Sequence, residues 1–157
     1  MPFEFATAGR IVFGAGKVAE AAPAAARLGT RALVVTGAKP HLAEPLLGML
    51  HDHGVATNTF RVENEPSTKT VAAGAELARM KACDLVIGIG GGSVLDTAKA
   101  VAALVANGGE LLDYLEVVGQ GRPLSRPSLP CIAIPTTAGT GSEVTRDRKS
   151  TRLNSSH

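Results

Sequence analysis

The residues best suited to chemistry form a glycine-rich run, Gly90, Gly91, Gly92 and Ser93, between an apolar segment and a helix-like one. Glycine lets the backbone approach a ligand closely. The first amides of a helix have no partner within it and carry partial positive charge, so they attract phosphate oxygens. A tight turn capped by Ser93 would need fewer glycines. We therefore predict phosphate or pyrophosphate binding at this run.

The run differs from two common phosphate motifs. The pattern GxxxxGK[ST] is absent from the sequence, which excludes a P-loop. The series Gly88-x-Gly90-x-x leads to Ser93 instead of a third glycine, and no acidic residue follows about twenty positions later, as the usual dinucleotide fingerprint requires.

A second polar run, PTTAGTGSEVT at 135–145, directly follows an apolar segment. A polar connector would also have this composition. So many small hydroxyl donors beside two glycines nevertheless suit the polar groups of a ligand. We expect both runs to bracket one extended, phosphorylated molecule. The hydroxyl side chains are those of Thr136, Thr137, Thr140, Ser142 and Thr145.

These runs need a sheet that brings them together. Strands are expected at 31–36, 55–62, 84–89 and 129–135, and helices at 17–28, 41–53, 68–81 and 93–106, after an opening hairpin formed by 3–5 and 10–13. Nearly all-apolar strands alternating with helices predict an α/β fold, doubly wound around a mostly parallel sheet. Ligands of such sheets bind at the carboxyl ends of the strands, here after Thr36, Ile89 and Ile134.

Composition narrows the function classes. A hydrophobic content of 45% suits one domain with a core, and 3% aromatic residues give little for bases to stack on. The N-terminus has no signal-peptide pattern and no apolar stretch is long enough to span a membrane, so we expect a cytoplasmic protein without membrane contact. Cys83 and Cys131 each border an apolar run and are expected to be buried, reduced thiols.

The last eleven residues, DRKSTRLNSSH at 147–157, are polar and lack the periodic apolar residues found in the rest of the chain. A disordered terminus would be equally polar, but the segment equals the codon-by-codon translation of a common sequencing-library adapter, which favours a non-native tail. Its three basic residues against one acidic residue account for the whole net charge of +2. Residues 1–146 are thus expected to be the natural domain, cut from a longer protein, with no charge that favours nucleic acid.

GGGSVLDTAKA at 90–100, followed by PTTAGTGSEVT, resembles the iron-containing alcohol dehydrogenase family, also called group III. The resemblance covers 1–146 and implies a Rossmann-like NAD(P)-binding domain. It places Gly91, Gly92 and Ser93 against the pyrophosphate and makes Asp96 and Lys99 part of the signature helix. It places Thr136, Thr137 and Thr145 on the nicotinamide and ribose side of the cofactor. The cofactor-binding residues expected in this sequence are Gly37, Gly90, Gly91, Gly92, Ser93, Asp96, Thr136, Thr137, Thr140 and Thr145.

Two positions depart from the family pattern. Glu65-Pro66 stands where Asn-Pro is usual near the cofactor. Gly37 stands where many NAD-preferring members have an Asp that binds the ribose diol and repels a 2′-phosphate; Lys39 is nearby. The missing acid removes the bar to NADP, so the sequence leaves NAD and NADP both open.

The resemblance also implies a divalent metal, Fe²⁺ or Zn²⁺, held by one Asp and three His of a C-terminal helical domain that this sequence does not contain. His41, His51 and His53 come too early in the chain to match those ligands. We therefore expect no catalytic residues here, and cofactor binding without turnover. The full-length protein is expected to be a homo-oligomer that acts on a small alcohol or aldehyde.

Alternatives within the superfamily are a glycerol dehydrogenase and a maleylacetate reductase, although maleylacetate reductases tend to lack the acid at Asp96. A dehydroquinate synthase fits the two motifs less well. A nucleotide-binding module without catalysis is an alternative of another class, and the adapter-like tail argues against it because the tail gives an accidental reason for the chain to stop.

Overall fold

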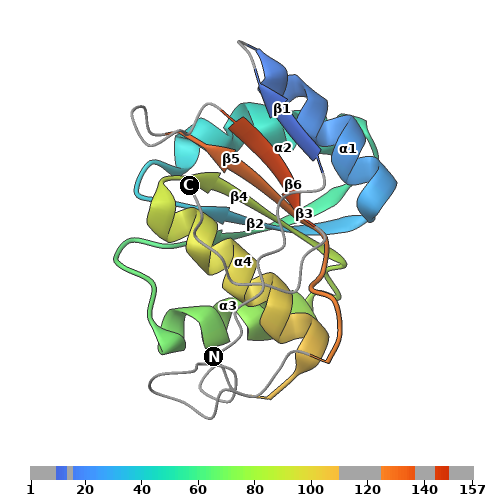
Figure 1. Ribbon diagram of the computed structural model, residues 1–157. Coiled ribbons are helices and arrows are strands. Elements are labelled where there is room, and N and C mark those ends of the chain that lie inside the picture. The colour runs from blue at the N-terminus through green and yellow to red at the C-terminus, as the bar shows by residue number, and fades with distance from the viewer. Residues whose placement is uncertain (1–9, 14–15, 110–124, 137–143, 149–157) are drawn as a thin grey trace.

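The computed structural model describes residues 10–13, 16–109, 125–136 and 144–148, which form a sheet with helices on both sides (Figure 1). Within these residues the sheet has six strands in the order β1-β6-β5-β4-β2-β3. The strands are β1 Arg10–Phe13, β2 Arg31–Thr36, β3 Ala56–Arg61, β4 Leu85–Gly90, β5 Cys131–Pro135 and β6 Val144–Arg148. The helices are η1 Lys17–Glu20, α1 Ala21–Leu28, η2 Pro40–Ala43, α2 Glu44–Asp52, α3 Thr68–Met80 and α4 Gly92–Asn107.

The centre of the sheet is parallel, as predicted from the apolar strands. β2 pairs in parallel with β3 and β4, and β4 pairs in parallel with β5. Every residue of β4 is buried, and so is every residue of β2 after Arg31. Burial on both faces explains why these strands are continuous apolar runs instead of alternating ones.

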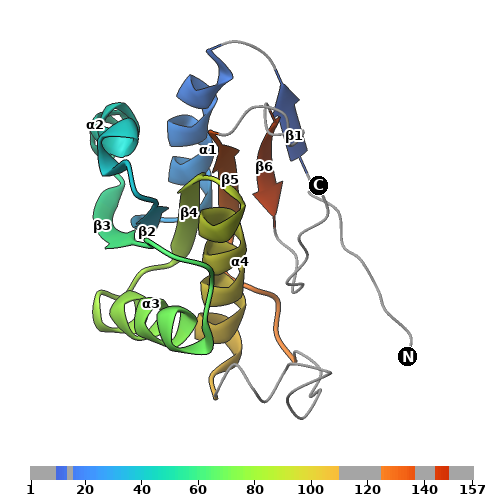
Figure 2. The same ribbon diagram turned by 90° about the vertical axis from the view of Figure 1, so that its left-hand side faces the viewer.

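The two faces of the sheet carry separate layers of core. Figure 2 shows α1 and α2 on one side of the sheet and α3 and α4 on the other. Because successive side chains of a strand point to opposite faces, Val34 packs with the α1–α2 layer, whereas Leu33 and Val35 pack with the α3–α4 layer. The fold is therefore doubly wound α/β, as expected.

One edge of the sheet was not predicted. β6 is antiparallel to both β1 and β5, with Val12 opposite Thr145 and Ala133 opposite Arg146. The segment 10–13 forms β1 and pairs with β6; residues 3–5, the other half of the expected opening hairpin, lie outside the described residues, so the hairpin stays a prediction. The last two residues of β6 belong to the segment expected to be a non-native tail, so the boundary after Arg146 falls inside a strand.

Three helix starts also differ from expectation. The segments at 17–28 and 41–53 each begin with a 3₁₀ turn, η1 and η2, before the α-helix proper. α4 begins at Gly92, so Gly91 is its N-cap and Ser93 lies inside its first turn. Of the two residues that could cap α3 by their type, Ser67 and Thr68, Ser67 is the N-cap, because its Oγ accepts a hydrogen bond from the Thr70 amide at 3.1 Å.

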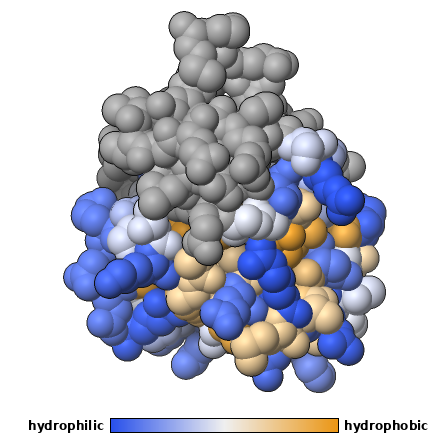
Figure 3. All heavy atoms as spheres, turned by 90° about the horizontal axis from the view of Figure 1, so that it is seen from below, coloured by the Kyte–Doolittle hydropathy of each residue, from blue (hydrophilic) through white to orange (hydrophobic). Residues whose placement is uncertain are grey.

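α3 and α4 approach closely beneath the sheet. A Cβ atom at Gly74 would lie 2.8 Å from Cγ2 of Val101, so only glycine permits this approach. Nη2 of Arg79, on α3, donates a hydrogen bond of 2.8 Å to the carbonyl of Leu104, on α4, and so links the two helices. Figure 3, seen from below, shows apolar surface among polar side chains on this side of the molecule. The C-terminal half of α4 is therefore packed against α3.

Two further expectations concern single features. Cys83 and Cys131 are both buried, as predicted. Among the described residues, no helix has the length and apolar character needed to cross a membrane.

Candidate functional site

An open cleft of about 440 Å³ lies at the carboxyl ends of the parallel strands. Three chain segments that are far apart in sequence form it: the loop after β2, the loop after β3 and the turn from β4 into α4. Its position agrees with the rule that ligands of open α/β sheets bind beyond the carboxyl ends of the strands. The lining residues are Gly37, Ala38, Val62, Glu63, Asn64, Glu65, Gly91, Ser93 and Val94.

The turn from β4 into α4 depends on Gly90. Its φ is +159°, and a Cβ atom there would lie 2.7 Å from Cγ2 of Val94 and 2.9 Å from its Cβ. Glycine therefore lets the first turn of α4 pack directly against the end of β4. Gly91 follows with φ −82° and ψ −170°, an extended conformation open to any residue.

The N-terminus of α4 opens into the cleft without a capping side chain. Its N-cap is Gly91, which makes no side-chain cap bond, and the Leu95 amide donates to the Gly91 carbonyl at 3.1 Å. The amides of Gly92, Ser93 and Val94 precede that bond and have no acceptor within the helix. α4 thus presents several N–H groups and the positive end of its dipole to the cleft.

The end of β5 is tied to the same turn. The Thr136 amide donates to the Gly90 carbonyl at 3.0 Å, continuing the parallel pairing of β4 and β5 by one residue. Thr136 is exposed there. The run that begins at Pro135 therefore leaves the sheet directly beside the glycine-rich turn.

The opposite wall is formed where β2 and β3 end together. The Val62 amide donates to the Thr36 carbonyl at 2.7 Å, so Gly37 and the segment 62–65 leave the sheet at the same level. Arg61 joins the two loops of this wall, because its Nη2 donates a hydrogen bond to the Ala38 carbonyl at 3.3 Å.

Comparison with known proteins assigns this arrangement to a family. The model of the family "Iron-containing alcohol dehydrogenase" matches residues 8–147. The chain belongs to the iron-containing alcohol dehydrogenase family. The expectation drawn from the two motifs is confirmed, as is the Rossmann-like α/β fold.

Three relatives illustrate the match. The chain is 38% identical over 150 residues to a sulfoacetaldehyde reductase of Bilophila wadsworthia, covering 92% of this chain and 38% of that one. It is 40% identical over 147 residues to long-chain-alcohol dehydrogenase 1 of Geobacillus thermodenitrificans, covering 87% and 37%. A crystal structure of sulfoacetaldehyde reductase from Bifidobacterium kashiwanohense in complex with NAD⁺ superposes with a TM-score of 0.68 at 31% identity, covering 90% and 38%. The chain thus spans less than two fifths of the length of these family members.

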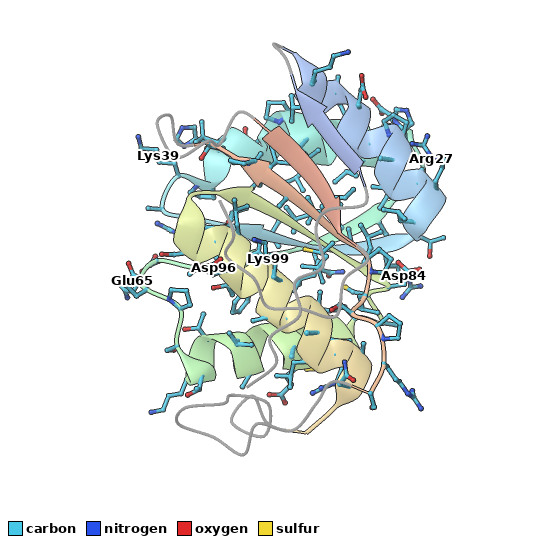
Figure 4. The ribbon with its side chains drawn as sticks, in the orientation of Figure 1. Arg27, Lys39, Glu65, Asp84, Asp96 and Lys99 are labelled. Atoms are coloured by element: carbon cyan, nitrogen blue, oxygen red, sulfur yellow. The ribbon has the colours of Figure 1, made fainter. Side chains whose placement is uncertain are left out.

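The residues expected at the cofactor site of this family member fall into three groups. Gly37, Gly91 and Ser93 line the cleft, and Gly90 and Gly92 flank Gly91 in the same turn. Asp96 is half-buried and Lys99 is buried, both on α4 (Figure 4).

The threonines are distributed less simply. Thr136 adjoins the turn through the bond described above, whereas Thr137 and Thr140 lie outside the described residues. Thr145 was expected in a polar loop, and this was wrong: it lies within β6. This segment is a strand because it pairs with β1 on one side and with β5 on the other.

Sequence reasoning missed part of one wall of the cleft. Glu63 and Asn64 line it, yet they were not singled out, because only the loops after Thr36, Ile89 and Ile134 were considered. The rule about carboxyl ends of strands, applied equally to the strand at 55–62, would have included them.

Two side chains with shifted pKa values lie away from the cleft. Burial raises the pKa of the Cys83 thiol, although a hydrogen bond from the Asn58 amide opposes this. The Asp84 carboxylate has a lowered pKa and stands at the opposite end of the sheet from Lys39 and Glu65 (Figure 4). These groups therefore belong to the scaffold.

The metal implied by the family name does not fit the described part of this chain. In those ranges no three His, Cys, Asp or Glu side chains gather in a way that could hold a metal ion. His41, at η2, and His51, near the end of α2, are on the α2 side of the sheet and outside the lining of the cleft.

Proposed function

We propose that this chain is the cofactor-binding part of a metal-dependent alcohol dehydrogenase, which transfers hydride between an alcohol and aldehyde pair and NAD(P). The observation that carries the proposal is the uncapped N-terminus of α4, which opens into the cleft beside the loops that follow β2 and β3. The names of the relatives support an alcohol or aldehyde as the small-molecule substrate.

The cleft suits a dinucleotide in size and chemistry. The amides of Gly92 and Ser93 would donate to pyrophosphate oxygens, and Gly91 would let the backbone come close to them. A cleft of about 440 Å³ lies within the range of small-molecule sites. Ser93 Oγ is not used as a helix cap, and its hydroxyl would be a further donor to the same group.

The other groups of the cofactor would lie on either side of this anchor. Thr136 and the run that follows it would contact the nicotinamide side, and the loops after β2 and β3 would contact the adenosine ribose. The bound nicotinamide ring supplies the chemistry, since it takes up or releases a hydride. The residues of this chain bind and orient that ring. NAD-type binding is supported by the relative that was crystallised with NAD⁺.

The test is a fluorescence titration of the purified chain with NADH and NADPH. Gly91→Val should weaken binding of both at least tenfold, because the side chain would fill the space that the pyrophosphate needs. The extended backbone of Gly91 admits valine, so the thermal unfolding midpoint should change little. Gly48→Val is the matched control, because Gly48 is exposed on α2 with no atom within 4 Å of its Cβ position and lies outside the cleft.

Two results would contradict the proposal. One is an unchanged affinity in Gly91→Val, which would remove the pyrophosphate from this turn. The other is the absence of saturable binding of either nucleotide to a chain whose folding is shown by a cooperative thermal transition.

A further inference from the structure

The specificity for the cofactor depends on the residues that meet the adenosine ribose. In dinucleotide-binding α/β folds an acidic side chain commonly accepts hydrogen bonds from the ribose diol and disfavours a 2′-phosphate. Gly37 and Ala38, which follow β2, offer no such side chain. A Cβ atom at Gly37 would lie 3.1 Å from Cγ2 of Val94, so there is little space for a side chain at position 37.

Acidic residues line the cleft in the neighbouring loop, which follows β3. Glu63 and Glu65 both line it, whereas no Lys or Arg is found among the lining residues that the structure describes. Because the Val62 amide is bonded to the Thr36 carbonyl, these residues follow the end of β3 at the level where Gly37 follows β2. The loop after β3 therefore carries acids in the same wall of the cleft where the loop after β2 carries none.

The two acids differ in their partners. Glu63 is engaged, because its Oε1 lies 3.2 Å from Nε of Arg61, whose Nη2 also donates to the Ala38 carbonyl. The charge of Arg61 is therefore largely matched within the wall. Glu65 is exposed and has no hydrogen bond or ion pair with any residue in the described ranges. Its carboxylate is an unmatched negative charge among the described residues that line the cleft.

The cationic residue closest in sequence to Gly37 is Lys39, the N-cap residue of η2. It is exposed and does not line the cleft. Figure 4 shows Lys39 and Glu65 at the same end of the sheet but on different loops. A 2′-phosphate in the cleft would meet Glu65 without an unpaired Lys or Arg in the lining to offset it.

We propose that Glu65 supplies the ribose-binding carboxylate that position 37 lacks, and that it makes this chain prefer NAD to NADP. The proposal rests on the proposed function, because it assumes that the cleft holds the dinucleotide. It decides between the two cofactors that Gly37 alone leaves open, since the loop after β3 supplies the acid that the loop after β2 lacks. Glu65 is then a specificity-determining residue of this site.

The test measures dissociation constants for NADH and NADPH by fluorescence, without catalysis. The unaltered chain should bind NADH about tenfold or more tightly than NADPH, the size expected of one close charge pair. Glu65→Gln should lower that ratio at least fivefold, mostly by improving NADPH binding, while Glu65→Asp should keep a preference for NADH. The ratio should also fall as salt is raised, because Glu65 is exposed and its charge is screened.

Glu76→Gln is the matched control, because Glu76 is exposed on α3, outside the cleft, and loses the same charge. It should leave the ratio within twofold of that of the unaltered chain. Gly37→Asp combined with Glu65→Gln should restore the NADH preference, after a small shift of the Val94 side chain.

The experiment distinguishes a failure of this inference from a failure of the proposed cofactor site. If both nucleotides bind but the unaltered chain prefers NADPH, or if Glu65→Gln leaves the ratio unchanged, Glu65 is not the determinant and the cofactor site stands. If neither nucleotide binds to the folded chain, both the inference and the proposed function are wrong.

Discussion

The carboxylate of Asp84 accepts a hydrogen bond of 2.9 Å from the backbone amide of Arg31, a residue 53 positions earlier in the chain. The amide and hydroxyl of Thr30 donate to the same carboxylate at 2.9 to 3.1 Å. These bonds lock the start of β2 to the start of β4, at the opposite end of the sheet from the cleft (Figure 4). One acidic side chain thus holds the register of the two strands whose far ends form the proposed site.

The first prediction concerns the stability that this carboxylate provides. Burial by itself would raise the pKa of Asp84, but the hydrogen bonds from Arg31 and Thr30 together outweigh it and lower the pKa. A lowered pKa means that the stabilisation is present above the unfolded-state pKa and is lost as the pH falls through the folded-state value. Asp84→Asn should therefore reduce the free energy of unfolding by about 1–3 kcal/mol at pH 7.

Urea unfolding at several pH values checks this prediction. The difference between Asp84→Asn and the unaltered chain should be constant near neutral pH and should shrink below about pH 4, where the aspartate of the unfolded chain begins to be protonated. A difference that persists unchanged at the lowest pH where the chain still folds would show that the charge of Asp84 contributes nothing. Glu44→Gln, on the exposed surface of α2, is a control for loss of one acidic charge.

The second prediction concerns Gly29, the C-cap residue of α1, which packs against the same carboxylate. A Cβ atom at Gly29 would overlap Oδ1 of Asp84 and lie 2.8 Å from Cδ2 of Leu85. Gly29→Ala should thus displace Asp84 from its amide donors and lower the free energy of unfolding by about 1–3 kcal/mol.

Gly48→Ala is the comparison for Gly29→Ala. Gly48 lies inside α2, and its Cβ position has no atom within 4 Å. The substitution should raise the free energy of unfolding by up to about 1 kcal/mol, because alanine favours a helix over glycine. Equal stabilities of the two variants in chemical denaturation would mean that Gly29 is not sterically required.

The sequence alone predicted the parts of the fold that local patterns specify. β2 and β4 were located to within a residue, because a short apolar run bounded by turn residues permits few other structures. The start of α3 also depends on a local interaction, since the hydroxyl of its N-cap residue Ser67 accepts a hydrogen bond from the backbone amide three residues on.

The unpredicted parts depend on residues distant in the sequence. β6 follows a run of glycine and threonine and has no strand-like alternation of its own; its pairing with β1 and β5 defines it. Glu63 and Asn64 were missed although Glu65 was singled out, and it is the parallel pairing of β2 with β3 that brings the segment 62–65 to the same end of the sheet as Gly37. The glycine-rich turn needed no such partner and was identified directly.

The third prediction separates packing from ligand binding within that turn. At Gly90 a Cβ atom would lie 2.7 Å from Cγ2 of Val94, and the φ of +159° disfavours other residues. Gly90→Ala should consequently push α4 away from β4 and lower the free energy of unfolding by about 1–3 kcal/mol. Thermal and urea unfolding measure this loss without any ligand.

Gly92, two residues later, should behave in the opposite way. Its Cβ position has no atom within 4 Å, so Gly92→Ala should leave the free energy of unfolding unchanged or slightly higher. The same open space at the first turn of α4 is where a pyrophosphate would approach the unpartnered amides, so the methyl group should weaken NADH binding at least tenfold. A Gly92→Ala variant that loses stability as Gly90→Ala does would assign Gly92 to packing; one that keeps full NADH affinity would move the pyrophosphate away from this helix.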